Sequence, residues 1–174
     1  MLQYKQAVQE YRSNIYNYAY YYLRNREEAE DVTQEVLIKL WNNWNSIDQS
    51  LLQPWIIRVT RNASIDALRK RKSYRSRVVK DADDYTMMSA TTPEPTPDRV
   101  VEGEDIRSRI LQALDEVKEP YKSVVILREI EDMKYEEISQ ALDIPLNTVK
   151  VYLHRGRHMI RNILRRTTNN EINR

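Results

Sequence analysis

The stretch MKYEEISQALDIPLNTVKVYLHRGRHMIRNILRR, residues 133–166, decides the fold of this chain. Apolar residues recur at helical spacing in its first part, which predicts a short helix over residues 135–142. Proline is tolerated at the start of a helix and not in its interior, so Pro145 predicts a second helix that begins at residue 145 or 146 and runs to residue 166. The stretch therefore predicts two helices joined by a tight turn.

The two faces of the second helix differ in their chemistry. One face is apolar and contains Val149, Leu153, Gly156, Ile160, Ile163 and Leu164. Its glycine is where another helix can approach closely. The opposite face contains Asn147, Lys150, Val151, His154, Arg155, His158 and Arg161. Residues 147–166 include six Lys or Arg and neither Asp nor Glu, so the outer face suits a polyanion.

A short helix, a turn and a longer helix with a cationic outer face are typical of the helix-turn-helix, whose second helix enters the DNA major groove by its N-terminal end. A helical hairpin with a solvated charged face is the alternative interpretation. The cationic residues lie opposite the apolar stripe and not around the whole helix, which favours DNA binding.

Composition limits the classes to which the rest of the chain can belong. The 174 residues are 41% hydrophobic, enough for one or two small cores, and they include only two glycines. Without a run of alternating β-branched residues, this composition predicts an all-α protein. The absence of cysteine excludes disulfides and fits a reducing cytoplasm. We find neither an apolar run of about 18 residues nor a signal-peptide pattern, and therefore expect a cytoplasmic protein without membrane insertion.

The net charge of +2 hides a segregation of charge along the chain. Residues 55–80 contain nine Lys or Arg and one acid, whereas residues 81–105 contain eight acids and one Arg. Apolar periodicity is lost over residues 76–103, where Pro93, Pro95 and Pro97 exclude a helix. We therefore expect two small helical domains, residues 1–75 and 104–168, joined by a flexible acidic linker at 76–103 and followed by a polar tail at 169–174.

The N-terminal domain is predicted to begin with two helices. The first spans residues 2–23, and its tyrosine-rich segment 16–22 suits core packing better than base stacking. Asn25 and Glu28 resemble a capping box that opens a second helix over residues 27–44. The buried side of that helix has Ala29, Val32, Val36 and Leu40; its other side has Asp31, Gln34, Glu35, Leu37, Ile38, Lys39 and Trp41. This mixed side suits a protein partner, although spacing alone also allows a solvated face.

Three further helices are predicted around the linker. Residues 45–53 form a polar loop, and Pro54 starts a third helix over residues 55–72. Its inward residues are Trp55, Ile56, Val59 and Ala63, and its outward residues are Arg58, Arg61, Asn62 and Arg69, which make a second cationic surface. After the linker, Ile106, Ile110, Leu114 and Val117 predict a helix that closes at Pro120. A strongly apolar helix over residues 121–131 then precedes the helix-turn-helix.

The motifs in these segments carry a family resemblance. They are AEDVTQEVL at 29–37, PWIIRV at 54–59 with Asn62, Asp66 and Arg69, YEEI at 135–138 and NTVK at 147–150. In this order and spacing, the chain resembles the bacterial RNA polymerase sigma factors of the extracytoplasmic-function group over nearly its whole length. The resemblance implies a promoter-specificity subunit with no catalytic residue, metal or cofactor. The implied partners are core RNA polymerase, promoter DNA and an anti-sigma factor.

The resemblance also implies three sets of site residues. The residues implied to bind core polymerase are Asp31, Gln34, Glu35 and Ile38. Those implied to recognise and open the minus-ten element are Ile47, Trp55, Arg58, Arg61, Asn62 and Arg69. Those implied to recognise the minus-thirty-five element are Asn147, Thr148, Lys150, Val151, His154, Arg155 and Arg157. The linker is implied to thread the polymerase cleft towards the RNA exit path.

Several positions depart from the family pattern. Leu37 stands where the family usually has Phe, Asn147 where it often has Gly, and Val151-Tyr152 where it commonly has Ser-Arg. The loop at 45–52 lacks the usual aromatic and glycine, so Ile47 stands at about the aromatic position. These departures concern the promoter sequence that is read and not the class of protein.

Two other classes of function fit the sequence less well. A stand-alone helix-turn-helix regulator with a helical N-terminal dimerisation or sensing domain would bind a duplex operator tightly without polymerase. An enzyme is disfavoured, because the sequence has neither a metal-ligand cluster nor a Gly-rich phosphate loop. His154 and His158 lie on a cationic face without a nearby carboxylate, as expected for DNA contacts or solvated residues.

Overall fold

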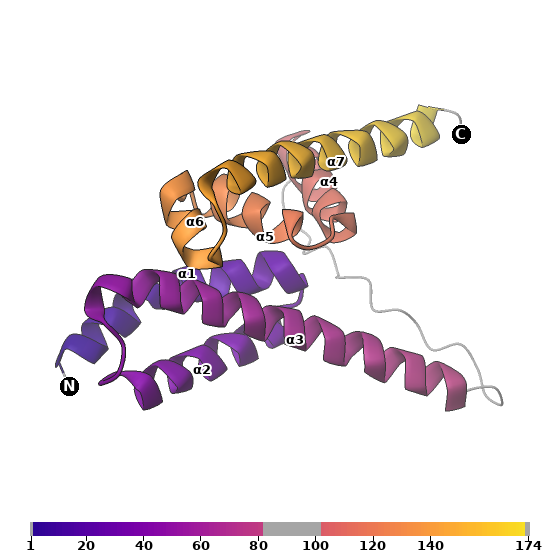
Figure 1. Ribbon diagram of the computed structural model, residues 1–174. Helices are drawn as coiled ribbons and strands as arrows, with labels where there is room; N and C mark the ends of the chain where they lie inside the picture. Colours follow the sequence, from indigo (N-terminus) through magenta and orange to yellow (C-terminus); the bar gives the residue numbers. More distant parts are fainter. Residues whose placement is uncertain (1, 82–101, 173–174) are drawn as a thin grey trace.

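The computed structural model describes the backbone of residues 2–81 and 102–172 and the side chains of residues 2–77 and 108–168. All regular structure within these ranges is helical, which confirms the predicted all-α class. The helices form two groups that lie against each other (Figure 1). The N-terminal group consists of α1 (Leu2–Leu23), α2 (Arg26–Asn43), the 3-10 turn η1 (Gln49–Leu51) and α3 (Leu52–Asp81). The C-terminal group consists of α4 (Glu102–Glu116), α5 (Tyr121–Val125), the π-helix η2 (Ile126–Ile130), α6 (Tyr135–Leu142) and α7 (Leu146–Ile172).

The first two helices end and begin where the sequence predicts. Arg24 takes a positive φ of 56°, which reverses the chain after α1. The Asn25 side chain then accepts a hydrogen bond of 2.9 Å from the backbone N–H of Glu28, which satisfies a free donor in the first turn of α2. The predicted inward residues Ala29, Val32, Val36 and Leu40 are all buried.

Helix α3 is longer at both ends than its predicted range of 55–72. It begins at Leu52, so Pro54 lies within its first turn, where the missing N–H has no intrahelical partner to lose. It continues past Lys72 to Asp81, because residues 73–81 contain neither Pro nor Gly to end it. The segment at 76–81, which we expected to belong to the linker, is therefore helical. The rest of that prediction, over 82–101, lies outside the described residues.

The helix-turn-helix forms as predicted. The Glu137 carboxylate accepts a hydrogen bond of 2.7 Å from the Lys134 N–H and so caps the first turn of α6. Asp143 ends that helix in the left-handed region, at φ 54°, a conformation that a short polar side chain tolerates. Helix α7 starts at Leu146 and continues beyond the predicted residue 166 to Ile172.

Gly156 lies at the closest approach between α7 and α5. A Cβ atom added at this position would lie 2.5 Å from Cγ2 of Val125 and 3.5 Å from the carbonyl oxygen of Tyr121. Val149 and Leu153, on the same stripe of α7, are buried as predicted. The absence of a side chain at Gly156 thus allows the long helix to lie directly on α5.

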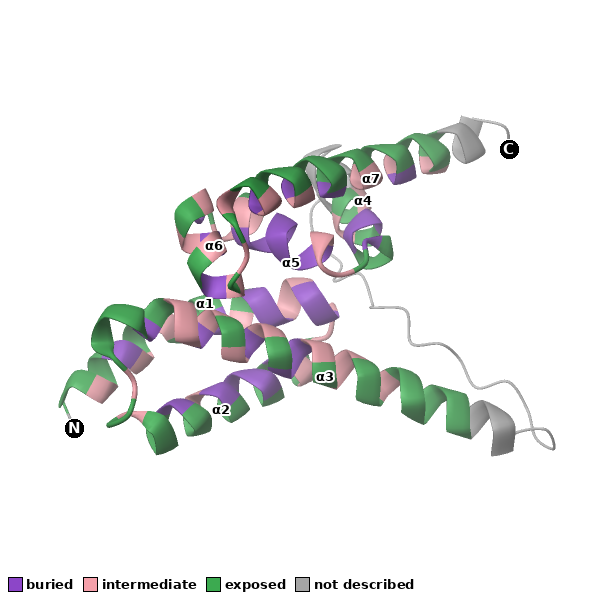
Figure 2. Cartoon of the chain, viewed as in Figure 1, coloured by how far each residue is buried: buried purple, intermediate pink, exposed green. Residues whose placement is uncertain are grey.

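The two groups of helices share a core, whereas the sequence predicts two small separate domains. Buried residues of α1 to α3, such as Ile15 and Ile56, belong to the same hydrophobic cluster as Val124 and Leu127 of the C-terminal group. Helix α6 packs against α3, and η2 packs against α1. Figure 2 shows the buried residues concentrated between the groups and on α5, while the outer side of α7 and the far end of α3 are exposed.

We expect Gly156→Ala to destabilise the fold by about 1 kcal/mol. Overpacking against the stiff Val125 side chain costs about 1–3 kcal/mol, and the better helix propensity of alanine returns up to about 1 kcal/mol. Urea unfolding followed by circular dichroism measures the difference. In a Val125→Ala background, which removes the clashing methyl group, the same substitution should be neutral or stabilising. An equal loss of stability in both backgrounds would contradict the assigned contact.

Candidate nucleic-acid and polymerase interface

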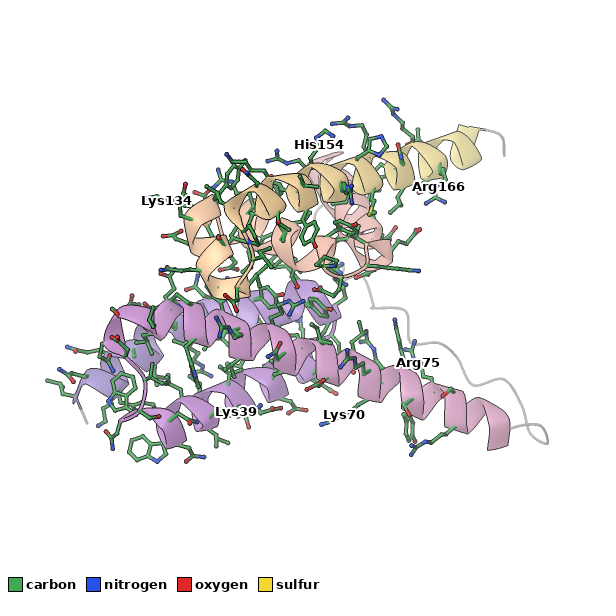
Figure 3. All side chains as sticks on the ribbon, in the orientation of Figure 1. Lys39, Lys70, Arg75, Lys134, His154 and Arg166 are labelled. Carbon is green, nitrogen blue, oxygen red and sulfur yellow. The ribbon has the colours of Figure 1, made fainter. Side chains whose placement is uncertain are left out.

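The outer face of α7 is open to solvent along its first half. Asn147, Lys150, Val151, His154 and Arg155 are all exposed, as the sequence predicts. Figure 3 shows His154 on the side of α7 that faces away from the N-terminal helices. Thr148 is half-buried at the start of the helix. An exposed, uninterrupted helix end of this kind has the shape that the DNA major groove accepts.

The cations on this face differ in how they are held. The Arg157 guanidinium donates to the Glu129 carboxylate at 2.6 and 3.0 Å, which ties that side chain back to η2. The Arg155 guanidinium lies 3.5 Å from the hydroxyl of Tyr121, a long contact with an uncharged group. The Val151 side chain is 46% exposed, an apolar group on a polar face. Because a charged partner already binds Arg157, Arg155 and Lys150 are better placed to donate to a base edge.

The predicted polymerase-binding face is exposed on α2. Asp31, Gln34 and Glu35 lie in solvent beside Ile38, which is 60% exposed. Trp41, one turn further along, is 52% exposed and packs its ring edge-on against Tyr4. An exposed Ile and Trp beside carboxylates form a mixed patch of the kind that occurs in protein interfaces.

The predicted minus-ten residues are not all open. Ile47 and Trp55 are half-buried and pack against the hydrophobic core. Asn62 and Arg69 are exposed on α3, and Arg69 forms a weak ion pair with Asp66 at 3.4 Å. Asn62 and Arg69 therefore lie on one face of α3, whereas the side chains of Trp55 and Ile47 lie partly in the core.

Arg58 and Arg61 contact the C-terminal group. The Arg61 guanidinium donates to the Glu119 carboxylate at 2.7 Å and to the Ser123 hydroxyl at 3.0 Å. The Arg58 guanidinium lies 3.4 Å from the carbonyl oxygens of Gln140 and Ala141 in α6. No sequence pattern predicts these contacts, because the partners are separated by more than fifty residues along the chain.

Burial shifts the pKa of two groups at this interface. The pKa of Tyr18, whose hydroxyl donates to Ser123 at 2.9 Å, is raised well above its usual value by burial and by the negative charge of Glu119. Burial also lowers the pKa of Lys122, although Asp115 opposes this shift from 3.7 Å. The contact between the groups thus contains polar side chains that are withdrawn from water.

The C-terminal part of α3 extends the second cationic surface beyond the predicted residues. Lys70, Lys72, Arg75 and Arg77 are exposed there, together with Tyr74, which is 71% exposed. Lys70 and Arg75 are labelled in Figure 3. The sequence predicts a linker from residue 76 on, whereas in the structure this run of charges continues α3 to Asp81.

The described residues hold no group of three His, Cys, Asp or Glu side chains placed to bind a metal ion. Both histidines lie on the exposed face of α7, and a ring nitrogen of His158 lies 3.2 Å from the Asn162 amide. Within the same ranges, we find no helix with the length and apolar character needed to cross a membrane.

Two segments of the chain match known protein families. Residues 7–74 match Sigma-70 region 2, and residues 107–160 match Sigma-70, region 4. The first match covers α1, α2 and most of α3. The second covers most of α4, continues through α5, η2 and α6, and ends within α7.

Two similar proteins are both named ECF RNA polymerase sigma factors. The chain is 33% identical over 159 residues to the ECF RNA polymerase sigma factor SigW of Bacillus subtilis (strain 168), which covers 89% of this chain and 85% of SigW. It is 29% identical over 159 residues to the ECF RNA polymerase sigma factor SigE of Mycolicibacterium smegmatis, over 91% of this chain. The aligned part of the chain spans 60% of the length of that second relative.

Two solved structures share the fold. One is the sigma factor RpoE in complex with the anti-sigma factor NepR from Bartonella quintana, with a TM-score of 0.67, 22% identity and coverage of 95% of this chain and 98% of RpoE. The other is CnrH in complex with the cytosolic domain of CnrY, with a TM-score of 0.67, 17% identity and coverage of 92% and 86%. The identity to SigW and the ordered pair of matched regions show that the chain belongs to the extracytoplasmic-function (ECF) sigma factors, the subunits that direct RNA polymerase to promoters.

Proposed function

We propose that three separate surfaces of this sigma factor divide the work of initiation. Asp31, Gln34, Glu35 and Ile38 on α2 bind core RNA polymerase; α3 and the loop before it read and open the minus-ten element; and the exposed face of α7 reads the minus-thirty-five element. The observation that carries the proposal is the open outer face of α7, which has neither Asp nor Glu over residues 147–166, at the end of a helix-turn-helix in a chain that matches both sigma regions. No observation favours the stand-alone regulator.

The chemistry of each surface fits its proposed task. Duplex reading requires a helix that fits the major groove and cations that hold its register on the phosphates, which α7 supplies. Opening requires a site for an unstacked base and a positive track for one strand. Asn62 and Arg69, continued by the basic end of α3, lie along one such track.

The domain organisation belongs to the same proposal. Residues 1–75 act as the polymerase-binding and minus-ten domain, and residues 104–168 act as the minus-thirty-five domain. The acidic segment at 76–103 connects them through the polymerase cleft, where its carboxylates mimic nucleic acid in a basic channel, and residues 169–174 form a polar tail.

An anti-sigma factor is the proposed regulatory partner. Both similar solved structures are complexes, one with the anti-sigma factor NepR and the other with the cytosolic domain of CnrY. In this chain, an apolar groove of about 630 Å³ runs between α4, η2 and α7, and it is lined by Ile110, Leu114, Ile130, Ile160 and Leu164. Such a groove can accept the apolar face of a partner helix.

The central test is transcription from a randomised promoter library with purified core polymerase. The wild-type chain should support initiation, and Asp31→Ala with Gln34→Ala should lose it by weakening the association with core. The matched control is Glu10→Ala with Gln6→Ala, which likewise removes one carboxylate and one Gln amide from exposed positions, here on α1. Equal pull-down of core by both double variants would overturn the assignment of α2. Tight operator binding without any polymerase-dependent transcription would overturn the function.

We expect Asn62→Ala to impair promoter opening more than recruitment, because this exposed amide lies on the proposed track for the single strand. Permanganate footprinting of the holoenzyme should show reduced thymine reactivity near the start site, while binding to the closed duplex changes little. Asn162→Ala, an exposed asparagine on α7, is the control. Undiminished reactivity in the Asn62 variant would count against the assignment.

We expect the two ends of the α7 face to have different roles. Residues near the N-terminus of a recognition helix reach base edges, whereas later ones hold phosphates. Arg155→Ala should cost about 1–3 kcal/mol at one base position and relax the preference there, while Arg161→Ala should weaken all sequences alike and reduce the salt slope by about one unit. Selection from a randomised minus-thirty-five library in holoenzyme measures both. A changed consensus with Arg161→Ala alone would place the helix in another register.

A further inference from the structure

The sequence has two histidines and no cysteine, and both histidines lie on the outer face of α7. His154 and His158 are exposed and stand one helical turn apart, so their side chains are neighbours on the same face. Their Cβ atoms are about 5–6 Å apart at this spacing. Two histidines at the same spacing on one helix bind the zinc ion in the metalloprotease motif, so the pair has the geometry of a metal-binding unit.

Both imidazoles can turn towards a shared ion, because solvent and not core packing surrounds them. A zinc ion lies about 2.0–2.1 Å from each imidazole nitrogen, which places the two nitrogens of a tetrahedral site roughly 3.3 Å apart. Two rings that lean towards each other from neighbouring turns of a helix reach this distance. Water molecules complete the coordination of the ion, as they do at zinc sites with an open position.

Asn162, one turn beyond the pair, is placed to orient one of the two ligands. Its side-chain amide lies 3.2 Å from the Nδ1 atom of His158. A half-turn of the amide brings its oxygen to this position, where it accepts a hydrogen bond from Nδ1–H. Metal-bound histidines usually donate their second ring N–H to an oxygen in this way, which leaves Nε2 as the ligand. The contact thus supports the tautomer of His158 that binds metal.

The surroundings of the pair select the class of ion. Residues 147–166 include neither Asp nor Glu, so this face has no carboxylate for Mg²⁺ or Ca²⁺, whereas imidazole suits zinc, nickel and copper. Arg155 and Arg161 lie near the pair and repel a dication, but both are exposed, and solvent and salt screen charges at a surface. Glu129 balances the charge of Arg157 at 2.6 Å.

We propose that His154 and His158 form a two-histidine site for a divalent transition-metal ion of the zinc, nickel and copper class, and that the bound ion and minus-thirty-five DNA exclude each other. The exclusion rests on the proposed reading role of the α7 face, whereas the metal site does not. A helix with its side chains is about 10–12 Å across and the major groove is about 12 Å wide. A helix that reads base edges therefore leaves no room for a hydrated ion on its contacting face.

The first measurement is a calorimetric titration of the full-length chain with Ni²⁺, in a buffer that does not bind metals. Wild type should bind one ion, and His158→Gln should bind it at least about tenfold more weakly, because the second imidazole of a pair acts at a high effective concentration. The matched control is Asn147→His with His154→Asn. This double variant keeps the composition but separates the histidines by eleven residues, about 16 Å along α7, and should bind as weakly as His158→Gln.

The second measurement identifies the ligands with Cu²⁺ as the probe. Electron paramagnetic resonance should show two coordinated imidazole nitrogens in wild type and one in His158→Gln. Asn162→Ala should weaken Ni²⁺ binding about tenfold and keep both imidazoles on Cu²⁺, because Asn162 positions a ligand and does not itself bind the ion.

The third measurement is the binding of a randomised DNA duplex to the full-length chain, followed by fluorescence anisotropy with and without Ni²⁺. At ten times the dissociation constant of the wild-type site, the ion should weaken duplex binding by wild type about tenfold, as expected for strict competition. The binding by His158→Gln should change by about twofold at most. Removal of Ni²⁺ with EDTA should restore the wild-type affinity.

Two results would overturn the proposal. Equal Ni²⁺ affinity in wild type and in the double variant with separated histidines would exclude the two-histidine site. Binding of Ni²⁺ by wild type without any loss of duplex affinity would exclude the competition. The library selection with Arg155→Ala in holoenzyme needs no added transition metal and reports on the reading role of α7 separately, so failure of the metal site and failure of that role are distinguishable.

Discussion

The arrangement of this sigma factor depends on the packing of short amphipathic helices that cannot bury their apolar faces alone. Helix α6 has only eight residues and α5 only five, so neither encloses a core without a neighbour. Within the C-terminal group, α7 supplies that neighbour at Gly156. Across the groups, α1 and α3 supply the rest, which is why buried residues from both halves form one cluster. The exposed functional faces are what remains after these apolar stripes are covered.

The same constraint explains which surfaces carry charge. A helix that packs through one stripe leaves the opposite stripe exposed, and over residues 147–166 of α7 that stripe contains cations and neither Asp nor Glu. On α2 the free stripe mixes carboxylates with Ile38 and Trp41, a composition suited to a protein and not to a polyanion. Helix α3 differs from both, because its outward stripe is divided between contacts to the C-terminal group and solvent. Fold and electrostatics thus assign different chemistry to each helix.

Local sequence rules predicted the ends of helices well where a capping residue or a proline marks the end. Asn25 with Glu28 predicted the start of α2, and Pro145 predicted the start of the second helix of the helix-turn-helix. The same rules fail for α3, because no Pro or Gly follows Lys72 closely and the apolar periodicity on which the predicted end rests is lost before the helix ends. An exposed helix needs no apolar stripe when its residues favour the helical conformation.

The exposure of the α2 and α7 sites followed from apolar periodicity, since both sites lie opposite a buried stripe. The engagement of Arg58 and Arg61 could not be predicted, since it depends on Glu119, Ser123 and α6, which are distant in sequence.

The length of α3 determines where the connection between the N-terminal and C-terminal groups of helices starts. A helix rises about 1.5 Å per residue, so the segment after Lys72 carries the chain roughly 13 Å beyond the predicted end before α3 finishes at Asp81. The segment 73–81 is helical and therefore much stiffer than a coil of the same length. The tether that joins the two domains therefore starts at a fixed distance and in a fixed direction from the body of the N-terminal group. That geometry sets the effective local concentration of one domain near the other. A change in the length of the helical segment 73–81 would alter this concentration without changing any residue of the proposed α2 and α7 surfaces.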